Sequence, residues 1–209
     1  MRIKNMAELE KLLAKKRETT QQEVIQLKNR QETETSTSQL LQARVIGLDV
    51  ALRCTGWGII DTRTRPFKQT AVDCGVIKNT PQIAISECLR HLAAATRELI
   101  GLYKPDIAVL EGGFYGQNVH TAVILGAARG AVISMLADAQ IPVYEYAPRK
   151  VKQAVCGFGN ASKEQVARLV AQFLNIQVES ISLDSTDALA MALCHAQMLS
   201  TPDGVGKPI

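Results

Sequence analysis

The segment ARVIGLDVALRCTGWGII (43–60) contains two strand-like runs that are separated by a short turn. ARVIGLDVA (43–51) is rich in apolar residues, LRCTG (52–56) has a turn composition, and WGIIDT (57–62) continues as a second strand. QTAVDCGVIK (69–78) has the composition of a third strand. Because the connections between these runs are short, we expect an antiparallel meander of three strands.

Beyond this meander, helical and strand-like segments alternate along the chain. Apolar residues at helical spacing predict a helix over 81–103, and Pro105 separates it from a fourth strand, IAVLE (107–111). The remaining elements are expected to be a helix rich in small residues (117–139), a fifth strand (142–146), and helices over 147–157, 163–174 and from Asp184 to about Leu199. This order predicts an α/β fold with a mixed five-stranded sheet and helices on both faces, and it resembles the ribonuclease-H-like fold.

The overall composition is that of a globular protein with a small basic excess. The chain has 209 residues, of which 46% are hydrophobic, and its formal charge of +4 is compatible with nucleic acid as a partner. Its five cysteines are odd in number and form no CxxC pair, which favours a reduced cytoplasmic protein over a zinc-bound or disulfide-linked one. We find no apolar run of membrane-spanning length and no secretory signal, so we expect no membrane association.

Residues 1–43 differ from the rest of the chain, since they contain no Gly, Pro or aromatic residue and many charges of both signs. Good helix formers occupy 7–30, and ETETSTSQ (32–39) has the composition of a linker. We therefore expect an N-terminal charged arm over 1–43 that is partly helical or disordered, a globular domain over 44–200 and a flexible tail over 201–209. Mixed charges favour a solvated arm, and an arm that contacts DNA or a partner protein is the alternative.

Four acidic residues stand at strand ends and at the start of a helix. Asp49 ends VIGLD, Glu111 ends IAVLE, and Asp184 and Asp187 open the helix DSTDALAMALCHA (184–196). Simple structural roles exist for some of them, because Asp49 suits a turn and an acid stabilises a helix N-terminus. Glu111 ends an otherwise apolar run, however, and Asp184 and Asp187 share one helix face. Acids at neighbouring strand ends repel one another unless a cation neutralises them, so the pattern predicts a metal site.

The kind of ligand in this pattern indicates which ion it binds. Carboxylate clusters without nitrogen or sulfur suit Mg²⁺, which proteins hold through a few carboxylates and substrate phosphate. We therefore expect phosphodiester chemistry with two Mg²⁺ ions, about 4 Å apart, that activate water and stabilise the leaving oxygen. Lys163 begins a helix after the turn GNAS (159–162), where its charge can meet a phosphate.

Four segments carry the motifs of a known family, in one order. IGLDVALRCTGWGII (46–60) is similar to its first hairpin, and PDIAVLEGGFYGQNVHTAVILGAARG (105–130) to its second acid, aromatic loop and following helix. VYEYAPRKVKQAVCGFGNASKEQV (143–166) is similar to its VKQ and G-G-A-K stretch, and DSTDALAMALCHA (184–196) to its D-x-x-D-A-L-A-x-A helix. The chain thus resembles the RuvC Holliday-junction resolvases over about 44–199, essentially the whole globular part.

This resemblance implies a metal-dependent endonuclease that resolves four-way (Holliday) junctions. By position, it implies four catalytic, metal-binding acids: Asp49, Glu111, Asp184 and Asp187. It implies DNA contacts from an aromatic residue that stacks on bases, Phe114, and from Lys152 and Lys163. We expect Lys150 to contact DNA as well. Lys163 also matches a residue that acts at the scissile phosphate. The family implies a homodimer that makes paired symmetric nicks beside a branch-migration motor, Mg²⁺ as cofactor with Mn²⁺ as a substitute, and a nucleoid-associated location in the cytoplasm.

Two departures from the family pattern indicate a divergent member. Val50 and Ala51 stand where the family usually has Pro and Gly, and Gly112 and Gly113 replace bulkier residues before Phe114. The main alternative is a non-catalytic branched-DNA-binding protein on the same fold, which the presence of all four acids disfavours. An actin-like phosphotransferase also starts its first hairpin with Asp and a Thr-Gly turn, but it requires a second, duplicated domain for which 209 residues leave no room.

Overall fold

A five-stranded sheet with the strand order β3-β2-β1-β4-β5 forms the centre of the fold. The computed structural model describes residues 42–64, 66–112, 118–177, 181–201 and 205–209. The strands are β1 (Gln42–Asp49), β2 (Cys54–Thr64), β3 (Phe67–Lys78), β4 (Ile107–Glu111) and β5 (Val143–Tyr146). The first three strands pair antiparallel, β4 pairs parallel with β1, and β5 pairs parallel with β4. The predicted meander and mixed sheet are therefore confirmed.

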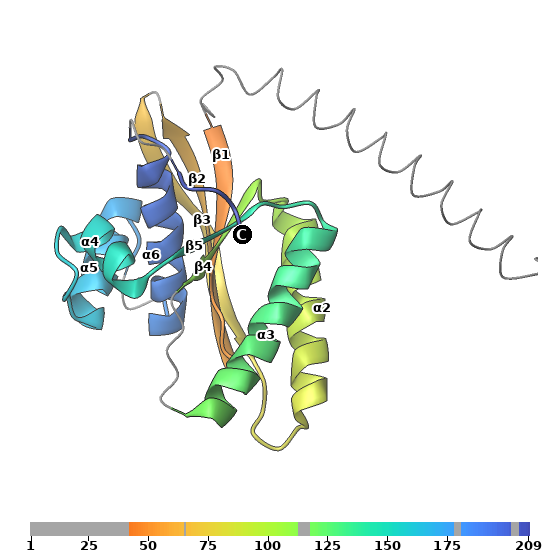
Figure 1. Ribbon diagram of the computed structural model, residues 1–209. Coiled ribbons are helices and arrows are strands. Elements are labelled where there is room, and N and C mark those ends of the chain that lie inside the picture. The colour runs from red at the N-terminus through yellow and green to blue at the C-terminus, as the bar shows by residue number, and fades with distance from the viewer. Residues whose placement is uncertain (1–41, 65, 113–117, 178–180, 202–204) are drawn as a thin grey trace, which may run out of the picture. The chain divides into compact units, whose positions relative to one another are not determined.

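Helices cover both faces of this sheet (Figure 1). One face carries α2 (Ile85–Tyr103) and α3 (Val119–Asp138), and the other carries α4 (Pro148–Cys156), α5 (Lys163–Leu174) and α6 (Leu183–Met198). Each face has its own core, because side chains of a strand alternate between faces. Ile46 and Leu48 of β1 pack in the α2–α3 core, whereas Val45 packs in the α4–α6 core. The predicted α/β architecture is confirmed.

The backbone of helix α6 packs directly against the backbone of the sheet, because two strand residues at the contact are glycines. A Cβ atom on Gly47 would lie 1.9 Å from the Ala188 carbonyl oxygen, and one on Gly56 would lie 2.0 Å from the Asp184 carbonyl oxygen. The helix suits this contact because it is rich in alanine and most of its residues are buried. The glycines of the first hairpin therefore set how closely α6, and the acids on it, approach β1 and β2.

Strand β1 is the first element that the structure describes. The chain divides into two units, Met1–Gln39 and Leu40–Ile209. β1 begins at Gln42, slightly before the expected domain start, and the predicted arm falls almost entirely outside the described residues. At the other end, the Ile209 amide donates to the Val143 carbonyl oxygen of β5, with 2.9 Å between the two atoms.

The start of α2 differs from the sequence prediction. The helix begins at Ile85, whereas helical spacing of apolar residues predicts a helix over 81–103. Arg53 accounts for the difference, because its guanidinium donates to the Thr80 and Ile83 carbonyl oxygens at 2.6 and 3.2 Å. These bonds hold the residues before Ile85 in a turn, so the helix begins only after this turn.

Helix α3 is a long, largely apolar helix on one face of the sheet. Among the residues that the structure describes, it is the one helix whose length and apolar composition could allow it to cross a membrane. Polar residues such as Arg129 and Ser134 interrupt the apolar residues of this helix, so they form no continuous apolar run in the sequence. Ala128, Val132 and Leu136 are buried in the α2–α3 core. Val119 and Val123 are 81% and 65% exposed, which leaves an uncovered apolar surface on this helix.

His195 of α6 is fully buried against two tyrosines of β5. Its Nδ1 atom lies 2.9 Å from the Tyr146 hydroxyl oxygen, and its ring centre lies 4.5 Å from that of Tyr144. Burial lowers the pKa of His195 from its ordinary 6.5 to about 4, because the charged imidazolium would lose its hydration in the core.

We expect His195 to make the protein sensitive to acid. The unfolded chain takes up a proton there below pH 6.5, whereas the folded protein does so only near pH 4, so stability is lost as the pH falls through this window. At pH 5 the loss is about 2 kcal/mol. His195→Gln should remove most of this loss of stability. The check is to measure the melting temperatures of both proteins at neutral and at acid pH. An equal fall in melting temperature for the two proteins would contradict this role.

Candidate active site

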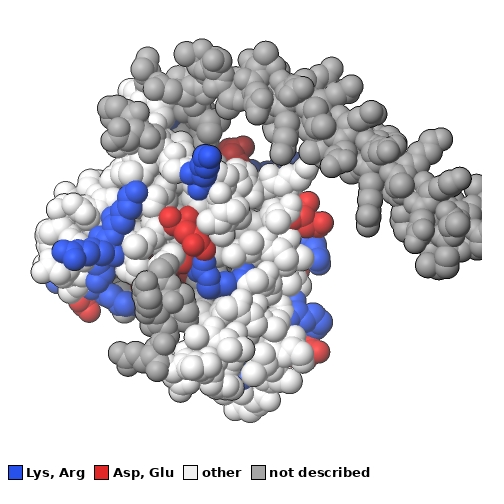
Figure 2. Space-filling model, in the orientation of Figure 1, with Lys and Arg blue, Asp and Glu red and all other residues white. Residues whose placement is uncertain are grey.

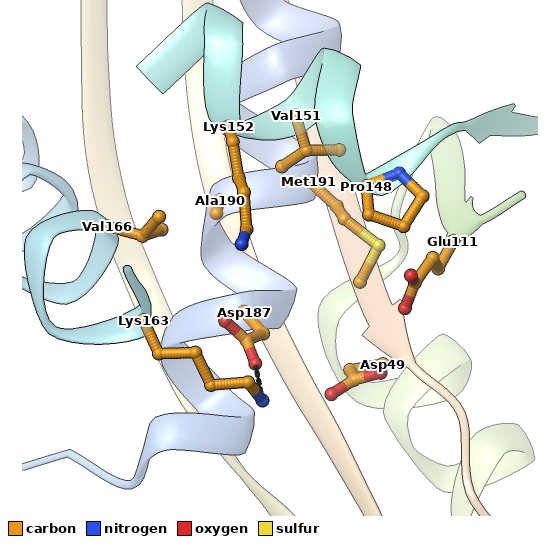
Figure 3. Close-up of a pocket in the computed structure, with 10 residues that line it drawn as sticks. All are labelled: Asp49, Glu111, Pro148, Val151, Lys152, Lys163, Val166, Asp187, Ala190 and Met191. Carbon is orange, nitrogen blue, oxygen red and sulfur yellow. Dashed lines mark hydrogen bonds and ion pairs between the residues drawn. The ribbon is translucent and has the colours of Figure 1, made fainter. Parts of the chain in front are cut away.

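A pocket of about 290 Å³ opens where β1 and β4 end, between these strands and helices α4, α5 and α6 (Figure 3). Acids, lysines and apolar residues line it: Asp49, Glu111, Pro148, Val151, Lys152, Lys163, Val166, Asp187, Ala190 and Met191. Three of the four acids and two of the three lysines that the sequence singles out therefore meet in one place. They come from five different elements of the fold.

The two strand acids are neighbours because β1 and β4 run parallel. The register pairs Leu48 with Leu110, so Asp49 and Glu111 follow at the same edge of the sheet. Asp49 is half-buried and Glu111 is exposed. Since the carboxyl ends of parallel strands meet at one edge, two segments that are far apart in the sequence deliver carboxylates to the same point.

The first two turns of α6 carry the other two acids, but only one of them lines the pocket. Asp187 lies opposite the strand acids, and its Oδ2 atom is 2.8 Å from Lys163 Nζ (Figure 3). Asp184 is not part of the pocket lining. Its Oδ2 atom instead accepts a hydrogen bond from the Cys54 thiol, with 2.9 Å between Sγ and Oδ2. The structure thus brings three acids together and leaves the fourth beside the pocket, at the start of the same helix.

Burial and neighbouring negative charges raise the pKa of the two strand acids. Burial raises the pKa of Asp49 to about 6, and the negative charges of Asp187 and Glu111 add to the rise. Desolvation and the charge of Asp187 also raise the pKa of Glu111, while Lys163 lowers it. The acids therefore carry more negative charge than their surroundings neutralise, and this favours a cation in the pocket.

Lys163 reaches the pocket because the N-terminus of α5 is firmly capped. Ser162 forms a capping box with Gln165, in which each side chain bonds to the other residue's backbone amide. This cap places Lys163 as the first residue of the helix, where it donates to Asp187. The hydrogen bond raises the pKa of Lys163, so the lysine is charged at neutral pH.

The other residues with expected DNA contacts lie differently. Lys152 of α4 also lines the pocket and enters from above Lys163 in the view of Figure 3. The Nζ atom of Lys150 lies 4.9 Å from the centre of the Tyr146 ring instead, and Lys150 is not part of the pocket lining. Phe114 lies outside the described residues. Figure 2 shows a compact group of acidic side chains on this face of the molecule, with lysine and arginine side chains near it.

The donor atoms at this pocket suit a hard cation. Asp49, Glu111 and Asp187 offer carboxylate oxygens, which Mg²⁺ and similar ions prefer. Within the described part of the chain, however, no three His, Cys, Asp or Glu side chains are already arranged as a group that could hold a metal ion. Asp187 is paired with Lys163, and the acids repel one another, so we expect cation binding to draw the carboxylates together.

Comparison with known proteins connects this geometry to one family. The family model described as crossover junction endodeoxyribonuclease RuvC matches residues 45–195. The chain belongs to the RuvC family. The crossover junction endodeoxyribonuclease RuvC of Roseiflexus sp. (strain RS-1) is 40% identical over 152 residues, which cover 73% of this chain and 89% of that protein.

Solved RuvC structures share the fold. The RuvC structure of Thermus thermophilus matches with a TM-score of 0.70 and 31% identity, and the match covers 79% of this chain and 99% of that one. T. thermophilus RuvC in complex with Holliday junction substrate matches with a TM-score of 0.70 and 29% identity over the same shares of the two chains. As a member of the RuvC family, this chain is a nuclease, and the family implies dependence on a divalent metal ion.

Sequence reasoning does not assign two neighbours of this RuvC-family site. Cys54 reaches Asp184 from the start of β2, and nothing in the turn that precedes it marks the thiol as a partner. Arg129 of α3 donates to the Glu111 carbonyl oxygen and to the Glu145 carboxylate. A charge in the middle of a largely apolar helix is the signal that could have identified Arg129, because such a charge requires a partner.

Proposed function

We propose that this chain resolves four-way DNA junctions by cutting two strands symmetrically about the junction. The observation that carries the proposal is the meeting of Asp49, Glu111 and Asp187 with Lys163 in one pocket. Carboxylates bind a cation there, and the cation together with the lysine can bind a scissile phosphate. The similarity to a RuvC solved in complex with Holliday junction substrate supports this choice of DNA.

The proposed cofactor is Mg²⁺, with two ions in each site and Mn²⁺ as a substitute. Asp49, Glu111 and Asp187 would hold the ions, and Asp184 would complete the set from the first turn of α6. When bound, Mg²⁺ promotes deprotonation of water and stabilises the charge that develops on the leaving oxygen. Lys163 neutralises charge on the phosphate from its place at the N-terminus of α5.

The proposed DNA contacts extend outwards from the pocket. Lys150, Lys152 and Lys163 bind backbone phosphates, which supply most of the affinity of such proteins for DNA. Phe114 stacks on an unpaired base at the junction centre, an interaction worth roughly 1–3 kcal/mol. The proposed location is chromosomal DNA in the cytoplasm, where a branch-migration motor would supply the protein with junctions.

The test of this function is incubation with a synthetic four-way junction and Mg²⁺, beside duplex, flap and RNA–DNA controls. We expect cleavage of the junction at two symmetric positions, and only when a divalent cation is present. Binding of the junction without cleavage, at every metal concentration, would support the non-catalytic alternative instead.

Metal binding should be visible as a change in stability. At neutral pH, Mg²⁺ at ten times its dissociation constant should stabilise the folded protein by about 1.4 kcal/mol, which raises the melting temperature by about 3–5 °C. Asp49→Asn should melt higher than the wild type without metal, because one repelling charge is removed, and should lose most of the rise with Mg²⁺. Glu87→Gln, on the exposed surface of α2, is the matched control, and its melting temperature should still rise with Mg²⁺. If Mg²⁺ raises the melting temperature of Asp49→Asn as much as that of the wild type, the metal does not bind at this site.

A homodimer is the proposed assembly, because a four-way junction has two scissile strands related by a two-fold axis and therefore needs two sites. Helix α3 offers the contact surface. Val119 and Val123 are among the most exposed large apolar side chains of the described residues. Nearby Gly126, Ala127 and Gly130 are exposed and small, which lets a second helix approach closely.

Val123→Glu is expected to convert the dimer to a monomer. A charge without a partner in an apolar contact costs several kcal/mol, so the dissociation constant should rise at least about a hundredfold. Light scattering measures the mass, and a cruciform plasmid distinguishes single from paired nicks. Leu102→Glu changes a residue of α2 that is 72% exposed and should leave both properties unchanged. A Val123→Glu protein that stays dimeric would exclude α3 as the contact.

A further inference from the structure

Arg129 connects three elements at the edge of the pocket. Its side chain leaves the middle of α3 and donates from one terminal nitrogen to the Glu111 carbonyl oxygen, at the end of β4. The other terminal nitrogen pairs with the Glu145 carboxylate of β5. The two side chains are only 15% and 29% exposed, so the ion pair is largely shielded from water.

The backbone around Glu111 is held closely at this point. The Gly112 amide donates to the Tyr146 carbonyl oxygen at 2.9 Å, which extends the pairing of β4 with β5 by one residue. A Cβ atom on Gly112 would lie 3.0 Å from Glu145 Cβ, so the chain passes directly against the residue that binds Arg129. The guanidinium therefore holds the last carbonyl group of β4 from one side while β5 holds the next amide from the other.

The Glu111 carboxylate itself lacks such support. Within the described residues, no hydrogen bond or ion pair to the Glu111 side chain is present, and the side chain is exposed. Its direction therefore depends on the backbone that carries it. Ligands of metal ions are commonly oriented by neighbours that do not touch the metal, and removal of such a neighbour weakens metal binding.

We propose that Arg129 is a positioning residue that aims the Glu111 carboxylate into the metal site, and that Glu145 keeps Arg129 in place. The proposal rests on the proposed role of Glu111 as a metal ligand. The planar guanidinium presents two donors in a fixed geometry, one for each acceptor, whereas a lysine ammonium at the same point is a single compact charge. Arg129 also makes α3, the helix with the exposed apolar surface, a direct neighbour of the site.

The test is a Mg²⁺ titration of junction cleavage by Arg129→Met and Arg129→Lys. In both variants the Mg²⁺ concentration for half-maximal cleavage should rise about 10–100-fold, with most of the rate recovered at saturating Mg²⁺. Junction affinity without metal should stay unchanged in Arg129→Lys, which retains the charge. Glu145→Gln keeps an acceptor for Arg129 and should show a smaller rise in the same direction. Arg90→Met breaks an exposed pair with Glu87 on α2 and should behave as the wild type.

A purely structural role predicts a different result. Melting temperatures would fall in the Arg129 variants while the half-maximal Mg²⁺ concentration of the folded fraction stayed unchanged, and this would overturn the proposal. If Arg129→Met does not fold, Arg129→Lys and Glu145→Gln test the proposal instead. An unchanged half-maximal Mg²⁺ concentration in both of these variants would overturn the proposal. The Asp49→Asn variant distinguishes a failure of the proposed metal site from a failure of the proposed role of Arg129. An active Asp49→Asn protein would refute the metal site itself, whereas an inactive one beside unchanged Arg129 variants would refute only the positioning role.

Discussion

Asp49→Asn is expected to reduce junction cleavage at least about 10³-fold, the upper end of what loss of one preorganised group costs, while junction binding persists. Asp49 lines the pocket together with the other two acids, and burial raises its pKa to about 6. Asparagine has nearly the same shape but no charge, so a cation loses a charged ligand. Binding should survive because DNA affinity comes mainly from lysine and arginine contacts to phosphate.

Cleavage rates at saturating protein and gel-shift affinities in Ca²⁺ measure the two properties separately. Asp138→Asn, at the exposed end of α3, is the matched control and should cleave normally. If Asp49→Asn cleaves junctions at the wild-type rate, the assignment of this pocket as the active site is wrong.

Gly47→Ala is expected to destabilise the protein by at least about 3 kcal/mol, at or beyond the usual range for an overpacked core. The added methyl group would lie 1.9 Å from the Ala188 carbonyl oxygen, which belongs to the backbone and cannot rotate away. The whole of α6 must shift, and Asp187 shifts with it. We therefore expect a melting temperature about 6–12 °C lower, and reduced cleavage by the protein that remains folded.

The control for this substitution is Gly101→Ala. A Cβ atom there meets nothing within 4 Å, and the residue lies in α2. Since alanine favours a helix over glycine by about 1 kcal/mol, this variant should be as stable as the wild type or more stable. If the Gly47→Ala protein has the same melting temperature as the wild type, the packing of α6 does not depend on this close approach.

The strands and helices were predictable from the sequence where local pattern and tertiary packing agree. VIGLD and IAVLE combine apolar runs with a terminal acid, and the ladder between β1 and β4 places both acids at one edge, as expected. DSTDALAMALCHA is a helix because small and long apolar side chains suit both a helix and a flat contact with the sheet. Local signals were sufficient for these elements.

The finer geometry of the site was not predictable, because it depends on contacts between distant residues. The spacing of Asp184 and Asp187 puts both on one helix face, yet Asp184 turns to Cys54 while Asp187 turns to Lys163. The contacts of Arg129 join α3 to two strands, and the sequence marks them only by a charge in the middle of a largely apolar helix. Hydrogen bonds between side chains that are far apart in the chain determine which acids line the pocket.

The order in which the pocket residues occur along the chain has a consequence for synthesis on the ribosome. Asp49 is made first, Glu111 next and Asp187 last of the three, and α6 must then pack onto β1 before the carboxylates meet. Contacts between such distant residues form late in folding. A nascent chain that has not yet released α6 therefore has no assembled pocket, and DNA is not exposed to a nuclease that is only partly made.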